Sequence, residues 1–154
     1  MTTKAEAAYE LFKAAIGQDE GTGEWLQVDQ DRINSFADVT EDHQFIHVDP
    51  EACKELSPWG VPIAHGFLTL SILSRLSEMT FSFSDRKMGI NYGLNRVRFT
   101  SPVRSGSKVR ARFKLGNYEK LDGGVQVTWN TTVEVEGSEK PALVAEWITR
   151  LVYG

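Results

Sequence analysis

The chain has 154 residues, 41% of them hydrophobic and 25% charged, with a formal net charge of −4. This length suits a single globular domain with a substantial core, and the acidic balance argues against nucleic acid as a partner. The only cysteine, Cys53, cannot form an internal disulfide, so we expect a protein of a reducing compartment, the cytoplasm. The longest apolar stretch, residues 63–76, is too short to cross a bilayer, so no membrane association is expected.

The first half of the chain predicts short helices separated by turns. Apolar residues at helical spacing over residues 4–16 predict an amphipathic helix, and the glycine-rich residues 17–23 then predict a loop. Residues 25–28 suggest a short strand. Asp29 is a suitable N-cap for a second helix, which runs into a turn over residues 40–47. Another short helix is expected to begin at Asp49 and Pro50.

The second half predicts one buried helix followed by a sheet. Apolar residues cover most of the circumference of residues 66–79, which predicts a helix buried on nearly all sides. Alternating apolar and polar residues then predict four long strands, with hairpin turns at residues 122–124 and 137–138 and a bulge near Asn95 and Arg96. The expected fold class is α+β, an antiparallel sheet curled around the helix.

Charge is unevenly distributed along the chain. Residues 1–60 hold 13 acidic and 4 basic side chains, whereas residues 86–118 hold 9 Lys or Arg and no acid. We favour a solvated sheet face paired with the acidic half of the chain. The alternative is a docking surface for a ligand that carries several phosphates.

A candidate acid/base pair lies in the turn between the second and third helices. Asp42 and His47 are five residues apart, and an Ala64-His65-Gly66 turn opens the apolar helix. A carboxylate and an imidazole at this spacing can converge on one water, and a helix N-terminus offers free backbone N–H groups to a developing negative oxygen. Either Asp42 is only a turn residue, or this segment is catalytic; the combination favours catalysis.

These residues resemble a known family. The segments 36–50 and 62–67 resemble the hydratase 2 motif of the MaoC-like, (R)-specific enoyl-CoA hydratases, which have the hot-dog fold, and the nodulation protein N-like branch is the most similar. The likeness covers about residues 25–152 and includes residues 98–103 with Gly106. We therefore expect one domain over residues 1–154, in which residues 1–24 form an N-terminal helix and loop extension.

The resemblance implies roles for three groups. Asp42 and His47 would be the catalytic dyad that holds the attacking water, and the backbone N–H of Gly66 would polarise the thioester carbonyl. The expected reaction is the reversible hydration of trans-2-enoyl thioesters to (R)-3-hydroxyacyl thioesters, with coenzyme A as the carrier and no cofactor. The chain departs from the family motif at three positions, which are Glu41 for Gly, Gln44 for Asn and Phe45 for Pro.

Further side chains are candidates for substrate binding, each with a plainer interpretation as packing, capping or surface. They are Gln44, Phe45, Trp59, Ala64, His65, Phe67, Ser74 and Arg104. Of these, Ser74 would line an acyl tunnel, and Arg104 would meet a coenzyme A phosphate. His65 is expected to be mainly structural. No metal is expected, because the three histidines lack a cysteine cluster or a known ligand spacing.

Two other functions stay open. A hot-dog thioesterase would use a carboxylate on the central helix, but Glu78 is the only acid there and lies far from Gly66. A non-catalytic acyl-thioester-binding protein would account for Gln44 and Phe45 as marks of a relaxed site. A homodimer is expected, because a single curved sheet leaves an edge and an apolar flank exposed.

Overall fold

The computed structural model describes residues 1–83 and 85–154, with the backbone alone for residues 19 and 20. The helices are α1 (Lys4–Ala15), α2 (Gln30–Thr40), α3 (Phe45–Val48), α4 (Pro50–Leu56), α5 (Gly66–Ser71) and α6 (Leu73–Thr80). The strands are β1 (Asp19–Thr22), β2 (Leu26–Val28), β3 (Met88–Phe99), β4 (Ser107–Leu121), β5 (Gly124–Val135) and β6 (Leu143–Val152). None of the described helices is long and apolar enough to span a bilayer.

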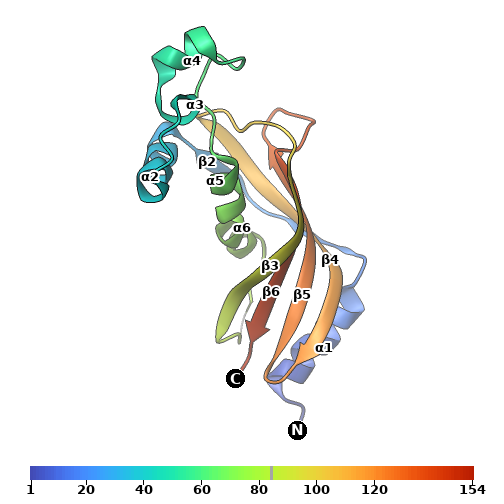
Figure 1. The fold of residues 1–154 in the computed structure, drawn as a ribbon. Coiled ribbons are helices and arrows are strands. Elements are labelled where there is room, and N and C mark those ends of the chain that lie inside the picture. Colours follow the sequence, from blue (N-terminus) through green and yellow to red (C-terminus); the bar gives the residue numbers. More distant parts are fainter. Residues whose placement is uncertain (84) are drawn as a thin grey trace.

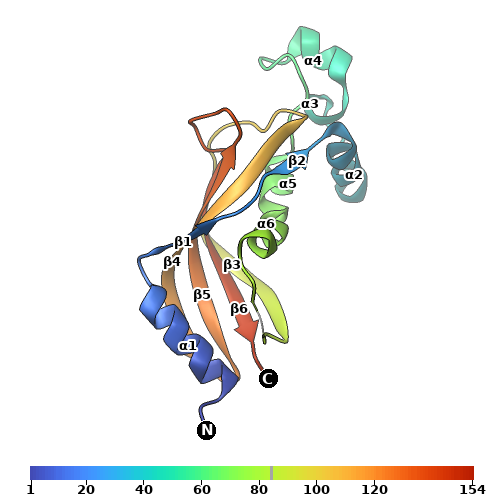
Figure 2. The ribbon, with the colours of Figure 1, turned by 180° about the vertical axis from the view of Figure 1, so that it is seen from behind.

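The strands form one antiparallel sheet in the order β1-β4-β5-β6-β3, with β2 also paired to β4. The sheet curves around α5 and α6, while α2, α3 and α4 project beyond one end of it (Figure 1). Figure 2 shows α1 at the opposite end of the sheet, where Phe12 contacts Trp129 edge to face. The α+β arrangement predicted from the sequence is confirmed.

The core lies between the sheet and the central helices. On β4, the inward side chains of Val109, Ala111 and Phe113 are fully buried, and the intervening basic residues face outward. Leu73 and Leu76 of α6 pack in the same hydrophobic cluster as these residues. The alternation of apolar and polar residues in the sequence therefore corresponds to one buried and one solvent-exposed face of the sheet, as expected.

Most predicted elements are found near their expected bounds. The Asp29 carboxylate caps α2 by accepting from the Arg32 N–H at 2.9 Å, and Asp49 caps α4 in the same way. The β4–β5 hairpin turns through Asp122 and Gly123. The predicted bulge is confirmed by a register shift between Leu94 and Arg96, and a second shift occurs between Asn91 and Gly93.

Two predictions about local structure are wrong. Residues 17–23 are not entirely a loop, because β1 pairs with β4, placing Gly21 opposite Phe113. The glycines of this segment weaken its strand propensity, but the free edge of β4 supplies backbone partners that the sequence pattern does not reveal. The helix over residues 66–79 is interrupted at Ile72, next to Ser71, whose hydroxyl donates to the Phe67 carbonyl at 2.6 Å and so favours a bend.

The central helices are also less buried than expected. Phe67 is 68% exposed, and Ser71, Ser74 and Glu78 on the same two helices are exposed as well. The exposed positions are a mixture of apolar and polar residues, so helical periodicity alone could not distinguish burial against the sheet from burial against another partner.

The charge interpretation needs a correction as well. Arg110 and Arg112 both pair with Glu134 on the neighbouring strand β5, rather than with the acidic N-terminal half. The guanidinium of Arg110 also lies 4.4 Å from the centre of the Trp25 ring. On this part of the outer sheet face, a single cross-strand carboxylate therefore partly neutralises two arginines.

Candidate active site

Asp42 is placed by the end of α2. Glu41 caps this helix in the left-handed conformation, with φ 60° and ψ 24°, and thereby turns the chain toward α3. The Asp42 side chain is exposed, and one carboxylate oxygen lies 3.4 Å from the Gln44 backbone nitrogen. The turn thus leaves most of the carboxylate free to meet a ligand.

His47 lies in the short helix α3 and is only 6% exposed. Its Nδ1 lies 2.7 Å from the Ile63 carbonyl oxygen, and because a carbonyl can only accept, Nδ1 carries the proton. Burial lowers the pKa of His47, an effect that the Ile63 hydrogen bond opposes. At neutral pH the ring is therefore uncharged, with a bare Nε2 that can act as a base.

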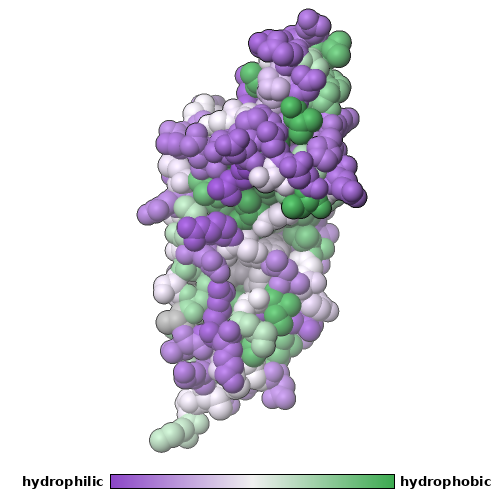
Figure 3. Space-filling model, turned by 90° about the vertical axis from the view of Figure 1, so that its left-hand side faces the viewer, coloured by the Kyte–Doolittle hydropathy of each residue, from purple (hydrophilic) through white to green (hydrophobic). Residues whose placement is uncertain are grey.

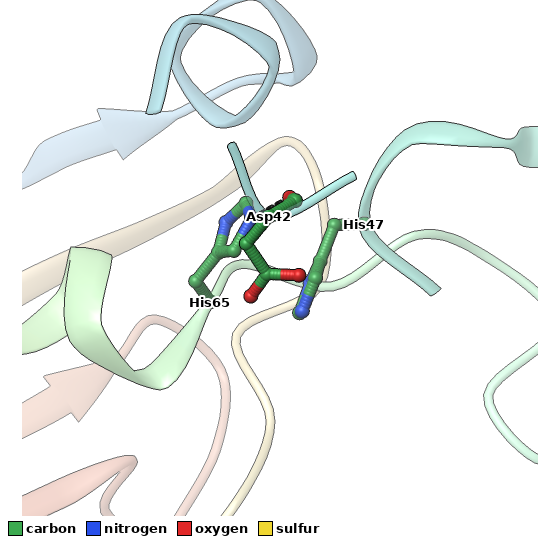
Figure 4. Close-up of side chains that lie close together, drawn as sticks. All are labelled: Asp42, His47 and His65. Atoms are coloured by element: carbon green, nitrogen blue, oxygen red, sulfur yellow. Dashed lines mark hydrogen bonds between the residues drawn. The ribbon is translucent and has the colours of Figure 1, made fainter. Parts of the chain in front are cut away.

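His65 completes a compact group of three side chains. It is 2% exposed, and its Nε2 donates to the main-chain carbonyl of Asp42 at 2.9 Å. Its ring stacks on that of His47, with centroids 3.8 Å apart and an angle of 20° between the planes. In Figure 4 the Asp42 carboxylate points toward the His47 ring, and one polar atom from each of the three side chains lies within 4.8 Å of the others.

This trio does not suit a metal ion. Two of the four imidazole nitrogens already donate to carbonyl groups. Because the two rings are nearly parallel, their remaining lone pairs run side by side and do not converge on one point, as the ligands of a tetrahedral or octahedral ion would. The arrangement favours acid/base chemistry.

The segment before α5 holds the site together through main-chain hydrogen bonds. The Ile63 N–H donates to the Ile46 carbonyl at 2.9 Å, while the Ile63 carbonyl accepts from His47. On the other side, the Ala64 N–H donates to the Val103 carbonyl at 2.7 Å. One extended segment thus links α3 to the loop that follows β3.

Gly66 begins α5 beside this group. Its N–H belongs to the first turn of the helix, where amides have no acceptor within the helix. It lines a hollow of about 280 Å³ together with Trp59, Ala64, Thr69 and Phe99. A Cβ at Gly66 would lie 3.1 Å from the Phe99 ring, so a glycine leaves this wall of the hollow open.

The remaining predicted residues lie at varying distances from this group. Trp59 and Ala64 share the hollow with Gly66, whereas Gln44 and Phe45 are exposed at the start of α3. Phe67 is exposed and meets Phe99 edge to face. Ser74 and Arg104 also lie outside the lining of the hollow, as Gln44, Phe45 and Phe67 do: Ser74 accepts a hydrogen bond from Asn91 on β3, and Arg104 is exposed and forms an isolated β-bridge with Ile63.

Sequence reasoning missed three contributors to the site. Phe99 and Thr69 line the hollow, and the Ile63 carbonyl fixes the protonated nitrogen of His47. Phe99 lies in the segment 98–103 that carried the resemblance, so that segment was a signal for it. The role of the Ile63 carbonyl could not be predicted from the sequence, because every residue has a main-chain carbonyl.

Comparison with known proteins identifies relatives over nearly the whole chain. Residues 11–137 match the family described as MaoC like domain. Nodulation protein N of Rhizobium meliloti is 52% identical over 138 residues, which cover 86% of this chain and 84% of that protein. The 3-hydroxyacyl-thioester dehydratase Z of Mycobacterium tuberculosis is 52% identical over 140 residues, which cover 90% of this chain and 92% of that protein.

The fold is also found among solved structures. A MaoC-like dehydratase from Rhodospirillum rubrum superposes with a TM-score of 0.73 at 20% identity, covering 91% of this chain and 94% of that one. At this identity the likeness concerns the fold alone. It confirms the hot-dog fold that the sequence resemblance implied.

Proposed function

Since the chain belongs to the MaoC-like dehydratase family and is a hydro-lyase, we propose that it interconverts trans-2-enoyl and (R)-3-hydroxyacyl thioesters of coenzyme A in the cytoplasm. In this proposal Asp42 and His47 form the catalytic dyad, and the Gly66 N–H binds the thioester oxygen. No cofactor is required, because the dyad itself supplies the base and the acid.

The observation that carries this proposal is the donation from His47 Nδ1 to the Ile63 carbonyl. It leaves a bare Nε2, and the Asp42 carboxylate is likewise only an acceptor. A single water has two hydrogens and can donate one to each group. Its oxygen then keeps a lone pair free to attack the β-carbon of the enoyl group, with the proton passing to the dyad.

The developing negative charge needs its own partner. As water adds, electron density moves to the thioester oxygen, and an unoccupied amide at the start of α5 can donate to it. One such donor typically contributes a factor of about 10² to 10³ in kcat. In this proposal the proton that ends on the α-carbon comes from the Asp42–His47 pair.

The test is hydration of crotonyl-CoA, followed by loss of enoyl absorbance. Asp42→Asn and His47→Gln should each keep the fold and reduce kcat by about 10² or more, because each removes one acceptor of the water. His43→Gln is the matched control, since His43 is exposed and paired with Asp38 at 2.9 Å, outside the trio. Near-wild-type hydration by either dyad variant would remove the basis of the proposal.

The same assay separates the two rival functions. A thioesterase would release free coenzyme A thiol, and a binding protein would retain crotonyl-CoA without turnover. Glu78, the carboxylate that a thioesterase would need on the central helix, lies in α6 and pairs with Arg86 at 3.3 Å. Because Glu78 lies at the other end of the central helices from Gly66, it is poorly placed to serve as the catalytic carboxylate of a thioesterase.

We further propose a homodimer formed along β3. This strand is the edge of the sheet opposite β1, and Ile90, Tyr92 and Leu94 on it are all more than 40% exposed. Figure 3 shows hydrophobic side chains in the middle of this flank, below the largely hydrophilic α2–α4 region. A second copy would pair the free strand edge and cover the exposed face of α5 and α6.

A further inference from the structure

His65 has a hydrogen-bonding pattern that defines its protonation. Its Nε2 faces the main-chain oxygen of Asp42 at 2.9 Å and must donate. Its Nδ1 is buried and has no hydrogen-bond partner among the described residues. A proton on that nitrogen would be a buried, unpaired donor on a cationic ring, so the ring is neutral, with Nδ1 bare.

The same ring touches both members of the proposed dyad. It bonds to the backbone of Asp42 and lies flat against the ring of His47. Phe36 closes its other side, with ring centroids 4.9 Å apart. His65 is therefore held between α2 and α3, and two of its contacts, with Asp42 and His47, restrain groups that the proposed reaction uses.

Stacking also has an electrostatic consequence. The titratable groups that act on the His47 ring are His65, from the start of α5, and Asp42, from the turn after α2. His65 acts to lower the pKa of His47, and Asp42 acts to raise it. Two imidazoles in face-to-face contact cannot both carry a positive charge without strong repulsion, so the pair favours a neutral base.

We propose that His65 is a positioning residue for the hydration reaction: through its bond to the Asp42 carbonyl and its stacking on His47, it holds the carboxylate and a neutral imidazole in the geometry that binds the reacting water. This inference rests on the proposed function. It assigns to His65 a role in the reaction beyond packing at the helix start.

Two substitutions of His65 distinguish its hydrogen bond to Asp42 from its stacking on His47. His65→Gln places an amide N–H near the position of Nε2 and can keep the bond to Asp42, but it removes the stacked ring. His65→Asn is too short to reach that carbonyl and loses both contacts. We expect kcat to fall by less than about threefold in the Gln variant and by about tenfold or more in the Asn variant, with KM little changed.

A spectroscopic measurement makes the test independent of turnover. In ¹H–¹⁵N NMR of the imidazole rings, wild-type His47 should show the Nδ1-protonated tautomer, and its pKa should rise in His65→Gln because the neighbouring imidazole is gone while burial persists. The acid limb of kcat/KM against pH should move upward with it. The control His43→Gln should leave the His47 titration and the activity unchanged.

The outcomes decide the role of His65 separately from the reaction. If His47 titrates identically in wild type and His65→Gln, or if neither the Gln nor the Asn variant loses kcat, His65 is not a positioning residue. If wild-type protein fails to hydrate crotonyl-CoA, the proposed function fails, while the NMR comparison still tests the coupling of His65 to His47. If His65→Asn does not fold, the titration in His65→Gln alone decides.

Discussion

Gly66→Ala tests whether the start of α5 binds the substrate or merely begins a helix. Gly66 has no positive φ, so alanine can adopt its backbone conformation without strain. The added methyl would lie 3.1 Å from the Phe99 ring, closer than most such contacts. Because Phe99 is 48% exposed, its ring can move by the few tenths of an ångström that are required.

The expected magnitudes differ for stability and activity. Crowding against Phe99 costs about 1–2 kcal/mol, and the better helix propensity of alanine offsets up to about 1 kcal/mol. The net loss of about 1 kcal/mol would lower Tm by about 3 °C for a chain of this length. The same methyl narrows the approach to the amide, so kcat should fall by about 10² or more, equivalent to roughly 3 kcal/mol.

A double variant separates these two effects. Phe99→Leu removes the aromatic ring, so Gly66→Ala/Phe99→Leu should avoid the crowded contact while the methyl remains beside the amide. In the double variant, urea unfolding should therefore show recovered stability, whereas crotonyl-CoA hydration should remain slow. If Gly66→Ala hydrates within about threefold of wild type, or if activity recovers together with stability, the Gly66 amide does not bind the thioester oxygen.

Three further predictions concern pH, the α2 cap and assembly. Because the pKa of His47 is lowered in the native state, the unfolded chain binds the His47 proton more tightly, and the free energy of unfolding should fall as the pH drops below about 6.5. Urea titrations at several pH values should show this loss, and the pH dependence should be weaker in His47→Gln. Glu41→Gly should raise the free energy of unfolding by up to about 1 kcal/mol by relieving the left-handed backbone, and an unchanged or lower urea midpoint would contradict this reasoning. Leu94→Arg, at the β3 edge, should yield monomers in sedimentation velocity; a dimer that persists would place the interface elsewhere.

The fold could largely be predicted from local patterns, because period-two alternation and caps such as Asp29 act within a few residues. The errors have a common physical cause. Pairing of Gly21 with Phe113 depends on a strand far away in sequence, and exposure of Phe67 depends on what lies opposite the helix. Neither property is encoded in the neighbouring residues.

Only part of the candidate site could likewise be predicted from the sequence. Residue type and spacing singled out Asp42 and His47 as a candidate pair, and the family resemblance supplied the role of Gly66; the structure places Asp42 and His47 together, with Gly66 next to His65. The stacking of His65 on His47 could not be predicted, because it depends on how α3 and α5 meet. The protonated nitrogen of His47 could not be predicted either, because a main-chain carbonyl fixes it.

The hydrogen bonds of Ile63 and Ala64 bear on how much this site tolerates change. Ile63 and Ala64 contribute only their peptide groups to these hydrogen bonds, so they hold the Asp42–His47 pair in place without depending on the nature of their own side chains. This accounts for a chain that has Glu41, Gln44 and Phe45 where the family motif has other residues, yet still brings Asp42 and His47 together. Variation at those three positions can therefore accumulate while the geometry of the Asp42–His47 pair is retained.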